Sequence, residues 1–135
     1  MSDKIRIGDV SSAVQDILDR YGEFAREALD DIVPQLAKDT VKKIRENIQT
    51  VGIGHGKKGD YAKGWKTKET KDVFGHIKAI AYNAKKPGLP HLLEFGHATR
   101  NGGRTKAYEH LEPAEEWAKN EAEKRVRREF EGGYY

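Results

Sequence analysis

The fold is decided by residues 11–49, SSAVQDILDRYGEFAREALDDIVPQLAKDTVKKIRENIQ, where apolar residues recur at the spacing of a helix. Oppositely charged residues four positions apart, such as Asp16 and Arg20, also favour a helix. Pro34 has no amide hydrogen, so we predict a long helical segment that is kinked or split near this residue. Its apolar stripe contains Val14, Ile17, Leu18, Tyr21, Phe24, Ala25, Ala28, Leu29, Ile32, Leu36, Val41, Ile44 and Ile48.

A glycine-rich segment, residues 51–64, follows this helical stretch and predicts a flexible loop. Its residues 54–59 match G-x-G-x-x-G by letter, but a dinucleotide site needs a strand before this motif and a helix after it. The order here predicts a helix before it, so we favour a loop that orders on assembly. The candidate interface residues are Gly54, His55, Gly56, Lys57, Lys58, Gly59 and Trp65.

Two strands are expected next, residues 65–70 with lysines on one face and residues 73–83 with a more apolar side. A turn near Lys71 and Asp72 would join them as a hairpin. The second strand is expected to present Val73, Ile77, Ala79 and Ala81 on one side.

The last part of the chain predicts a short helix, a loop and a long helix. Leu92, Leu93 and Phe95 are expected to pack as an anchor, and Gly96 ends their helix. Residues 97–106 read as a loop, whose middle contains Gly102 and Gly103. Pro113 and Ala114 open the final helix. Together these elements predict one α+β domain over residues 1–135, with helices on a small antiparallel sheet and loose tails at residues 1–10 and 131–135.

Composition limits the classes of function. The chain has 135 residues, 35% of them charged, with a mean hydropathy of −0.86, and it has no cysteine. Disulfide scaffolds and thiolate zinc sites are therefore excluded. We find no apolar run of about 20 residues and no apolar stretch after the first six residues, so we expect no membrane partner and no secretory signal. A reducing cytoplasm is the expected place of synthesis.

Charge is unevenly distributed along the chain. Residues 1–53 have a net charge of −2, residues 54–106 have +8, and residues 107–135 have −3. A basic middle between acidic ends suits either contact with nucleic acid or copies that pair opposite surfaces. Solvated lysines without a partner are the third interpretation.

Five histidines raise the question of a metal or catalytic site: His55, His76, His91, His97 and His110. His91 and His97 are six residues apart and lack the spacing of a zinc helix. Either could form an acid–base pair with Glu94, which leaves a hydrolase as a further hypothesis, although no nucleophile accompanies them. Hydrogen bonding within loops is the favoured role, and we predict no metal, cofactor or catalytic residue.

Residues 90–97, the Asn101-Gly102-Gly103 turn and residues 110–114 carry a resemblance to a known family. The chain resembles the head–tail joining or tail-completion proteins of long-tailed bacteriophages. In that family a Glu-aromatic-Gly motif closes a short helix, and Pro-Ala opens the last helix. The order of elements agrees from about residue 12 to residue 120, including the Gly64-Trp65 strand start. One departure is Glu112, where family members often carry an arginine before Pro-Ala.

The resemblance implies a structural, non-enzymatic protein of the virion, made in the host bacterial cytoplasm. Such proteins form a ring, commonly a hexamer, at the neck between the head connector and the tail. The implied partners are further copies of the chain, the head-closure or connector protein, and the tail terminator or tail tube protein. The 51–64 loop would order against a partner ring or face packaged DNA. The motif residues are Leu92, Leu93, Glu94, Phe95, Gly96, Gly102, Gly103, Pro113 and Ala114. The alternative function is a small basic protein that binds nucleic acid without sequence preference.

Overall fold

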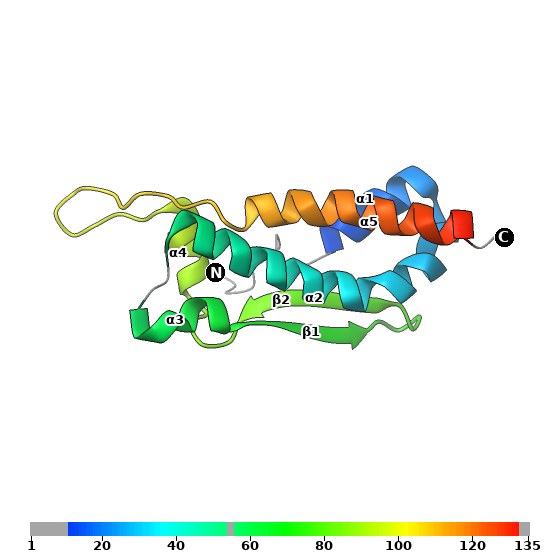
Figure 1. Ribbon diagram of the computed structural model, residues 1–135, viewed down its shortest axis with the longest axis horizontal. Coiled ribbons are helices and arrows are strands. Elements are labelled where there is room, and N and C mark those ends of the chain that lie inside the picture. The colour runs from blue at the N-terminus through cyan, green and yellow to red at the C-terminus, as the bar shows by residue number, and fades with distance from the viewer. Residues whose placement is uncertain (1–10, 54–55, 133–135) are drawn as a thin grey trace.

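The computed structural model describes residues 11–53 and 56–132, which form an α+β fold. In chain order the elements are α1 (Ser11–Tyr21), η1 (Glu23–Ala25), α2 (Arg26–Val51), α3 (Gly56–Lys63), β1 (Trp65–Lys71), β2 (Ile77–Asn83), α4 (Leu89–Phe95) and α5 (Glu112–Gly132). Helices α1, α2 and α5 lie on one side of the two-stranded antiparallel sheet (Figure 1). The long helix α2 lies between the C-terminal helix α5 and the sheet.

The N-terminal helical segment is split, but at Gly22 and not near Pro34. Gly22 has φ 81°, a left-handed conformation that glycine adopts at low cost, and it separates α1 from α2. Pro34 lies inside α2, which continues through it to Val51. Of the two alternatives, a kink or a split near Pro34, the split is not found there; the helical segment is interrupted at Gly22. Packing of α2 on both of its neighbours outweighs the one hydrogen bond that proline removes.

Helix α2 holds the core together because its buried side chains contribute to two clusters. One cluster joins its first half to α1, to the last turns of α5 and to Ala79 of β2. The other joins its second half to Tyr61, Trp65 and Leu111. Polar contacts reinforce the helix layer, since Arg125 of α5 donates to Asp39 of α2 at 2.7 Å.

The hairpin forms as predicted, although its connection is longer. Trp65 pairs with Asn83 at one end and Lys71 pairs with Ile77 at the other. Val73 belongs to the connecting turn, where it is 93% exposed, so its predicted place in the second strand is wrong. The carboxylate of Asp72 accepts hydrogen bonds from the backbone N–H groups of Phe74 and His76, which stabilises a turn in place of further strand.

The segment predicted as a flexible loop contains a helix, α3. Gly52 ends α2 in the left-handed conformation, with φ 70° and its N–H directed at Ile48 and Gln49 carbonyls. Residues 54 and 55 lie outside the described residues. Tyr61, near the end of α3, is only 2% exposed. Its burial stabilises the helix and offsets the low helix propensity of the glycines in α3. The loop prediction is therefore wrong for residues 56–63.

Burial also corrects the predictions for single side chains. Trp65, named among the candidate interface residues, is fully buried in the second core cluster. Leu92 and Phe95 are 38% and 55% exposed, so in the single chain they are not a packed anchor, whereas Leu93 packs against the second cluster. At the C-terminus Glu131 and Gly132 belong to α5, and residues 133–135, like residues 1–10, lie outside the described residues.

Within the described residues, no helix combines the length and the apolar character that crossing a bilayer requires.

Candidate functional site

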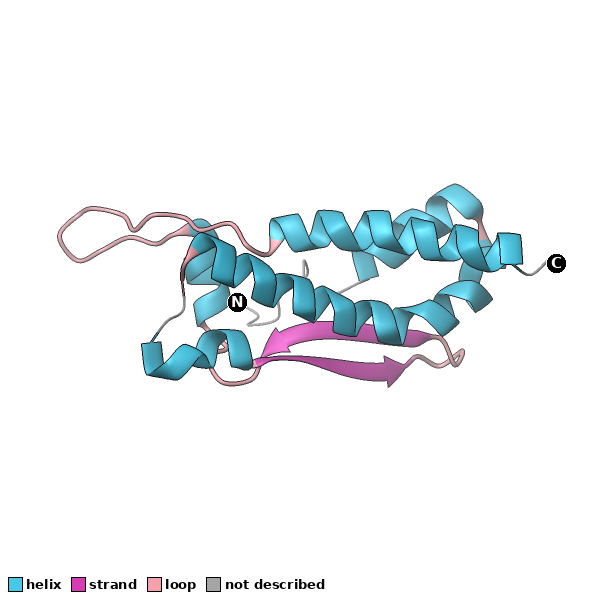
Figure 2. Ribbon diagram, in the orientation of Figure 1, coloured by secondary structure: helices cyan, strands magenta, loops and turns pink. Residues whose placement is uncertain are grey.

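An arm, residues 97–107, extends beyond the end of the helix layer (Figure 2). Its two halves pair through the bridge between Ala98 and Arg104 and through the hydrogen bond from Thr105 N–H to the His97 carbonyl, at 2.8 Å. All its residues except Thr99 are exposed. The arm confirms the predicted loop and shows that it reaches outward from the molecule.

The turn of the arm explains two glycines of the motif. Gly102 has φ 85°, which favours glycine, and its N–H donates to the Thr99 carbonyl at 3.2 Å. A Cβ atom on Gly103 would lie 3.3 Å from the Thr99 hydroxyl oxygen, which leaves little space for a larger residue. Both glycines therefore shape the turn of the arm.

The base of the arm is held by a clamp, which we define as Tyr61, Glu94, Gly96 and His110. Glu94 is 2% exposed, and its carboxylate accepts hydrogen bonds from the backbone N–H groups of His110, Leu111 and Glu112 at 2.9, 2.9 and 3.1 Å. These amides form the start of α5, where N–H groups lack partners within the helix. The carboxylate of α4 thus caps α5 across the base of the arm.

Electrostatics keep Glu94 ionised. Burial alone would raise the pKa of this carboxyl group, but the hydrogen bonds from the His110 side chain and from the three amides outweigh burial. The pKa of Glu94 falls to about 2 as a result. The partners of Glu94 follow the arm in the sequence, where the chain enters α5.

His110 completes the clamp from inside the protein. It is fully buried, and its Nδ1 lies 2.6 Å from the Tyr108 carbonyl and 3.0 Å from a Glu94 oxygen. Because the carbonyl can only accept, Nδ1 carries a hydrogen. The Tyr61 hydroxyl lies 2.6 Å from Nε2 and donates to it when the imidazole is neutral. Burial raises the pKa of the Tyr61 hydroxyl, so it stays protonated.

Gly96 sits at the junction of α4 and the arm. It has φ 72°, and a Cβ atom placed there would lie 2.6 Å from the Thr105 carbonyl oxygen. Glycine is therefore required both for the backbone conformation and for the close approach of the two halves of the arm. Within the Glu-Phe-Gly motif, Glu94 therefore holds the start of α5, and Gly96 allows the close approach of the arm.

The remaining site residues have structural positions. Pro113 is the second residue of α5 and is exposed, while Ala114 is fully buried in the second core cluster. Gly56 and Gly59 lie in α3, as do Lys57 and Lys58. Gly54 and His55, which the sequence also suggested as interface residues, lie outside the described residues.

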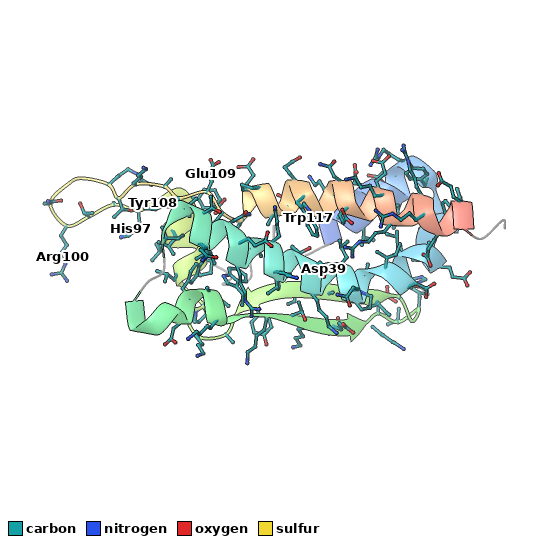
Figure 3. The ribbon with its side chains drawn as sticks, in the orientation of Figure 1. Asp39, His97, Arg100, Tyr108, Glu109 and Trp117 are labelled. Atoms are coloured by element: carbon teal, nitrogen blue, oxygen red, sulfur yellow. The ribbon has the colours of Figure 1, made fainter. Side chains whose placement is uncertain are left out.

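The arm itself is cationic. Figure 3 shows Arg100 at the far end of the arm, with His97 nearer its base. Arg104 lies 3.4 Å from the Phe95 carbonyl, and the Lys106 ammonium lies over the Tyr108 ring at 5.4 Å. The side chains of Arg100, Arg104 and Lys106 form no ion pair with a described residue. No carboxylate lies between residues 95 and 108 to neutralise them.

The geometry does not favour acid–base chemistry at Glu94. Both carboxylate oxygens accept backbone hydrogen bonds, and its histidine neighbour is His110, not His91 or His97. His91 instead lies against the Phe95 ring, and His97 bonds with the Thr105 hydroxyl. Among the described residues, no group of three or more His, Asp or Glu side chains is placed to hold a metal ion. The sequence did not predict the pairing of Glu94 with His110; its signal was a polar residue two positions before the start of α5.

Comparisons with known proteins identify the family. Searches of curated proteins and of solved structures find no match to the chain. Residues 12–96 match the model of the family described as "Bacteriophage HK97-gp10, putative tail-component". The matched region runs from α1 to Gly96, the last residue before the arm. Since it covers more than half of the sequence, the chain belongs to this family of bacteriophage tail components.

Proposed function

We propose that this protein is a non-enzymatic component of the virion that completes the tail and joins it to the head connector, as a ring at the neck. Membership of a tail-component family supports the proposal. The whole chain, residues 1–135, would act as one joining domain whose partners are further copies of itself, the connector or head-closure protein, and the tail terminator or tail tube. It would work by shape and charge at its surfaces.

The arm is the observation that carries this proposal. An exposed loop that extends from the molecule makes few stabilising contacts with its own chain. The base of this loop is nevertheless fixed by the buried Glu94 and His110. Ordering a polar loop costs conformational entropy, so a fixed direction of the arm is useful when another molecule receives it. Arginines at 100 and 104 suit carboxylate or phosphate partners because guanidinium groups bind them with two hydrogen bonds.

Complementary charge at the opposite end of the molecule supports assembly of copies. Glu27, Asp31 and Glu129, which we call the acidic end, lie where α2 begins and α5 ends, far from the arm in Figure 1. Burial first, and then the neighbouring Asp31 and Glu27 carboxylates, raise the pKa of Glu129. An approaching cation stabilises crowded carboxylates, and head-to-tail contacts of this kind form a ring when the rotation between copies closes.

Exposed apolar side chains occur at the same two ends. Val73 and Phe74 are 93% and 81% exposed in the hairpin turn, and Phe95 is 55% exposed beside the arm. Each would be removed from water when copies or neck partners pack against these ends. Exposed apolar side chains at both ends favour a protein that contacts another molecule at each end.

The test uses native mass, measured for the purified protein alone and after mixing with isolated tails. The proposal expects a ring in solution, or a monomer that becomes stably bound to tails. In the variant Arg100→Gln, Arg104→Gln, Lys106→Gln, ring formation or tail binding should fall at least tenfold while the melting temperature stays unchanged. The control, Lys38→Gln, Lys42→Gln, Lys124→Gln, removes the same charge from exposed helix positions outside the acidic end.

Two results would contradict the joining role. One is a monomer that ignores tails under all conditions. The other is an arm variant that assembles and binds tails as the unchanged protein does. A monomer that ignores tails but retains DNA at low salt would support the alternative, a nucleic-acid-binding accessory protein; the lysines of β1 and β2 are the observation that favours it.

A further inference from the structure

The sheet leaves one face uncovered by helices. Cross-strand pairing places Lys66 opposite Tyr82, Lys68 opposite Ile80, and Thr70 opposite Lys78, and these six residues form the outer sheet face. The other face carries the buried Ala79, Ala81 and Asn83, toward α2. In Figure 2 the helices of the layer lie on one side of the strands only.

The outer sheet face is cationic. Lys66, Lys68 and Lys78 are all exposed, and none of them forms an ion pair with a described residue. The face has no carboxylate, since Glu69 lies on the other side of β1. Ile80 and Tyr82 are half-buried in the middle, where the aliphatic parts of lysine side chains can cover them. The outer sheet face therefore presents mainly charged groups to solvent, although it contains two large apolar side chains.

We propose that the outer sheet face binds the phosphate backbone of duplex DNA without sequence preference. This inference rests on the proposed function, because a neck ring surrounds the path of DNA. Strand geometry places the three lysines within about 14 Å, a length over which a duplex presents on the order of eight phosphate charges. Lysine is a point charge suited to phosphates, and it reads no bases from a flat sheet.

The same composition argues against a protein partner at this face. Lysine is depleted in the centre of protein interfaces because its strongly hydrated ammonium is costly to bury. Phosphates of DNA stay largely in water, so the lysines can neutralise them without losing their hydration. The arginine-bearing arm, in contrast, suits contacts that exclude water.

The experiment measures binding of the full-length protein to a fluorescent duplex by anisotropy, over a series of salt concentrations. The sheet variant is Lys66→Gln, Lys68→Gln, Lys78→Gln, and the control for DNA binding is Lys42→Gln, Lys124→Gln, Arg128→Gln. Every lysine that neutralises a phosphate adds about 0.9 to the slope of log affinity against log salt, so this slope should be smaller by about 2 to 3 in the sheet variant. Its affinity at low salt should fall at least tenfold.

The control variant should keep both the slope and the affinity to within a factor of about two, since Lys42, Lys124 and Arg128 lie on the helix layer. Two duplexes of unrelated sequence should bind equally. An unchanged slope in the sheet variant, or an equal decrease in the control, would overturn the proposal.

Tail binding separates this inference from the proposed function. A sheet variant that no longer binds DNA but still assembles on tails supports both. If the sheet variant keeps DNA and also binds tails, the DNA surface is refuted while the joining role stands. If the sheet variant melts normally, binds DNA normally and fails on tails, the face is a protein interface and the inference is wrong.

Discussion

Glu94 connects three parts of the molecule through one carboxylate. Its oxygens hold the first amides of α5, its neighbour His110 reaches Tyr61 of α3, and its own helix leads into the arm. Removing the charge would leave buried amides poorly satisfied, which costs more than the net value of the hydrogen bonds themselves. The stability of the clamp should therefore depend on pH.

The first prediction concerns this pH dependence. The pKa of Glu94 is about 2 in the folded protein, below the ordinary value of 4.5. Its stabilisation is therefore complete above pH 4.5 and is lost as the pH falls toward 2; the full difference corresponds to on the order of 3 kcal/mol. Glu94→Gln should be less stable at pH 7 by a similar amount, and the difference should shrink on acidification.

Urea unfolding followed by circular dichroism, at several pH values between 2 and 7, measures this effect. Glu116→Gln is the control, since Glu116 is exposed on the same helix that Glu94 caps. Parallel stability curves for Glu94→Gln and the unchanged protein would show that the ionised carboxylate does not hold α5.

The second prediction compares two glycines with positive φ. Gly96→Ala combines an unfavourable backbone conformation with a contact of 2.6 Å to the Thr105 carbonyl, whereas Gly102→Ala has open space around the new Cβ. We expect Gly102→Ala to cost about 1 kcal/mol and Gly96→Ala to cost clearly more, about 2 to 4 kcal/mol. Thermal unfolding of both variants gives the order, and equal destabilisation would contradict the close approach.

The clamp shows where prediction from sequence stops. Gly96 and Pro113 were predicted in their places because helix ends have local signals. The partners of Glu94 were not, since they lie 16 to 18 residues away and meet it only after the arm folds back. Leu92 and Phe95 were expected to be packed, but an apolar residue on a two-turn helix has no periodicity long enough to show which side faces the core.

At the scale of elements, periodic helices were predicted well and glycine-rich ones were not. The segments 11–49 and 113–130 carry apolar stripes and i,i+4 charge pairs, and both are helical apart from the short interruption at Gly22. Helix α3 has a single buried anchor, Tyr61, among glycines and lysines, so its local pattern resembles that of a loop. Its formation depends on tertiary contacts, which sequence periodicity does not contain.

The third prediction concerns Pro34, the proline inside α2. Proline in a helix interior removes a hydrogen bond and crowds the preceding turn, and here the helix tolerates both. Pro34→Ala should therefore stabilise the protein by about 1 kcal/mol or more, which corresponds to a rise of about 2 to 5 °C in melting temperature.

Lys38→Ala, an exposed change one turn further along α2, is the control and should shift the melting temperature by less than about 1 °C. A fall in the melting temperature of Pro34→Ala would mean that the packing of the proline ring contributes more than the hydrogen bond it removes.

For the whole molecule, charge is arranged in space more clearly than along the sequence. The sequence showed a basic middle with a net charge of +8, and the fold gathers part of its cations on the arm and part on the outer sheet face. Carboxylates gather at the acidic end, across the length of the molecule. Only the fold could show this separation, because α2 and α5, which supply the acidic end, are distant in the chain.

The fourth prediction follows for assembly. If the arm of one copy meets the acidic end of the next, self-association should weaken with salt, because the screening length falls from about 10 Å at 0.1 M to about 4 Å at 0.5 M. Sedimentation at both salt concentrations measures the effect. Association that strengthens with salt would indicate that the apolar ends, and not the charges, hold copies together.

The two-stranded sheet has a consequence for the protein before it enters a particle. Among residues 11–53 and 56–132 each strand has one neighbour, so both edges keep hydrogen-bonding groups to which a further strand could add. Repulsion between the lysines that project from β1 and β2 discourages such stacking while newly made copies wait in a crowded cell. The lysines would thus protect the protein from aggregation before assembly. Because salt screens their repulsion, the purified protein should stay soluble longer at low ionic strength than at high.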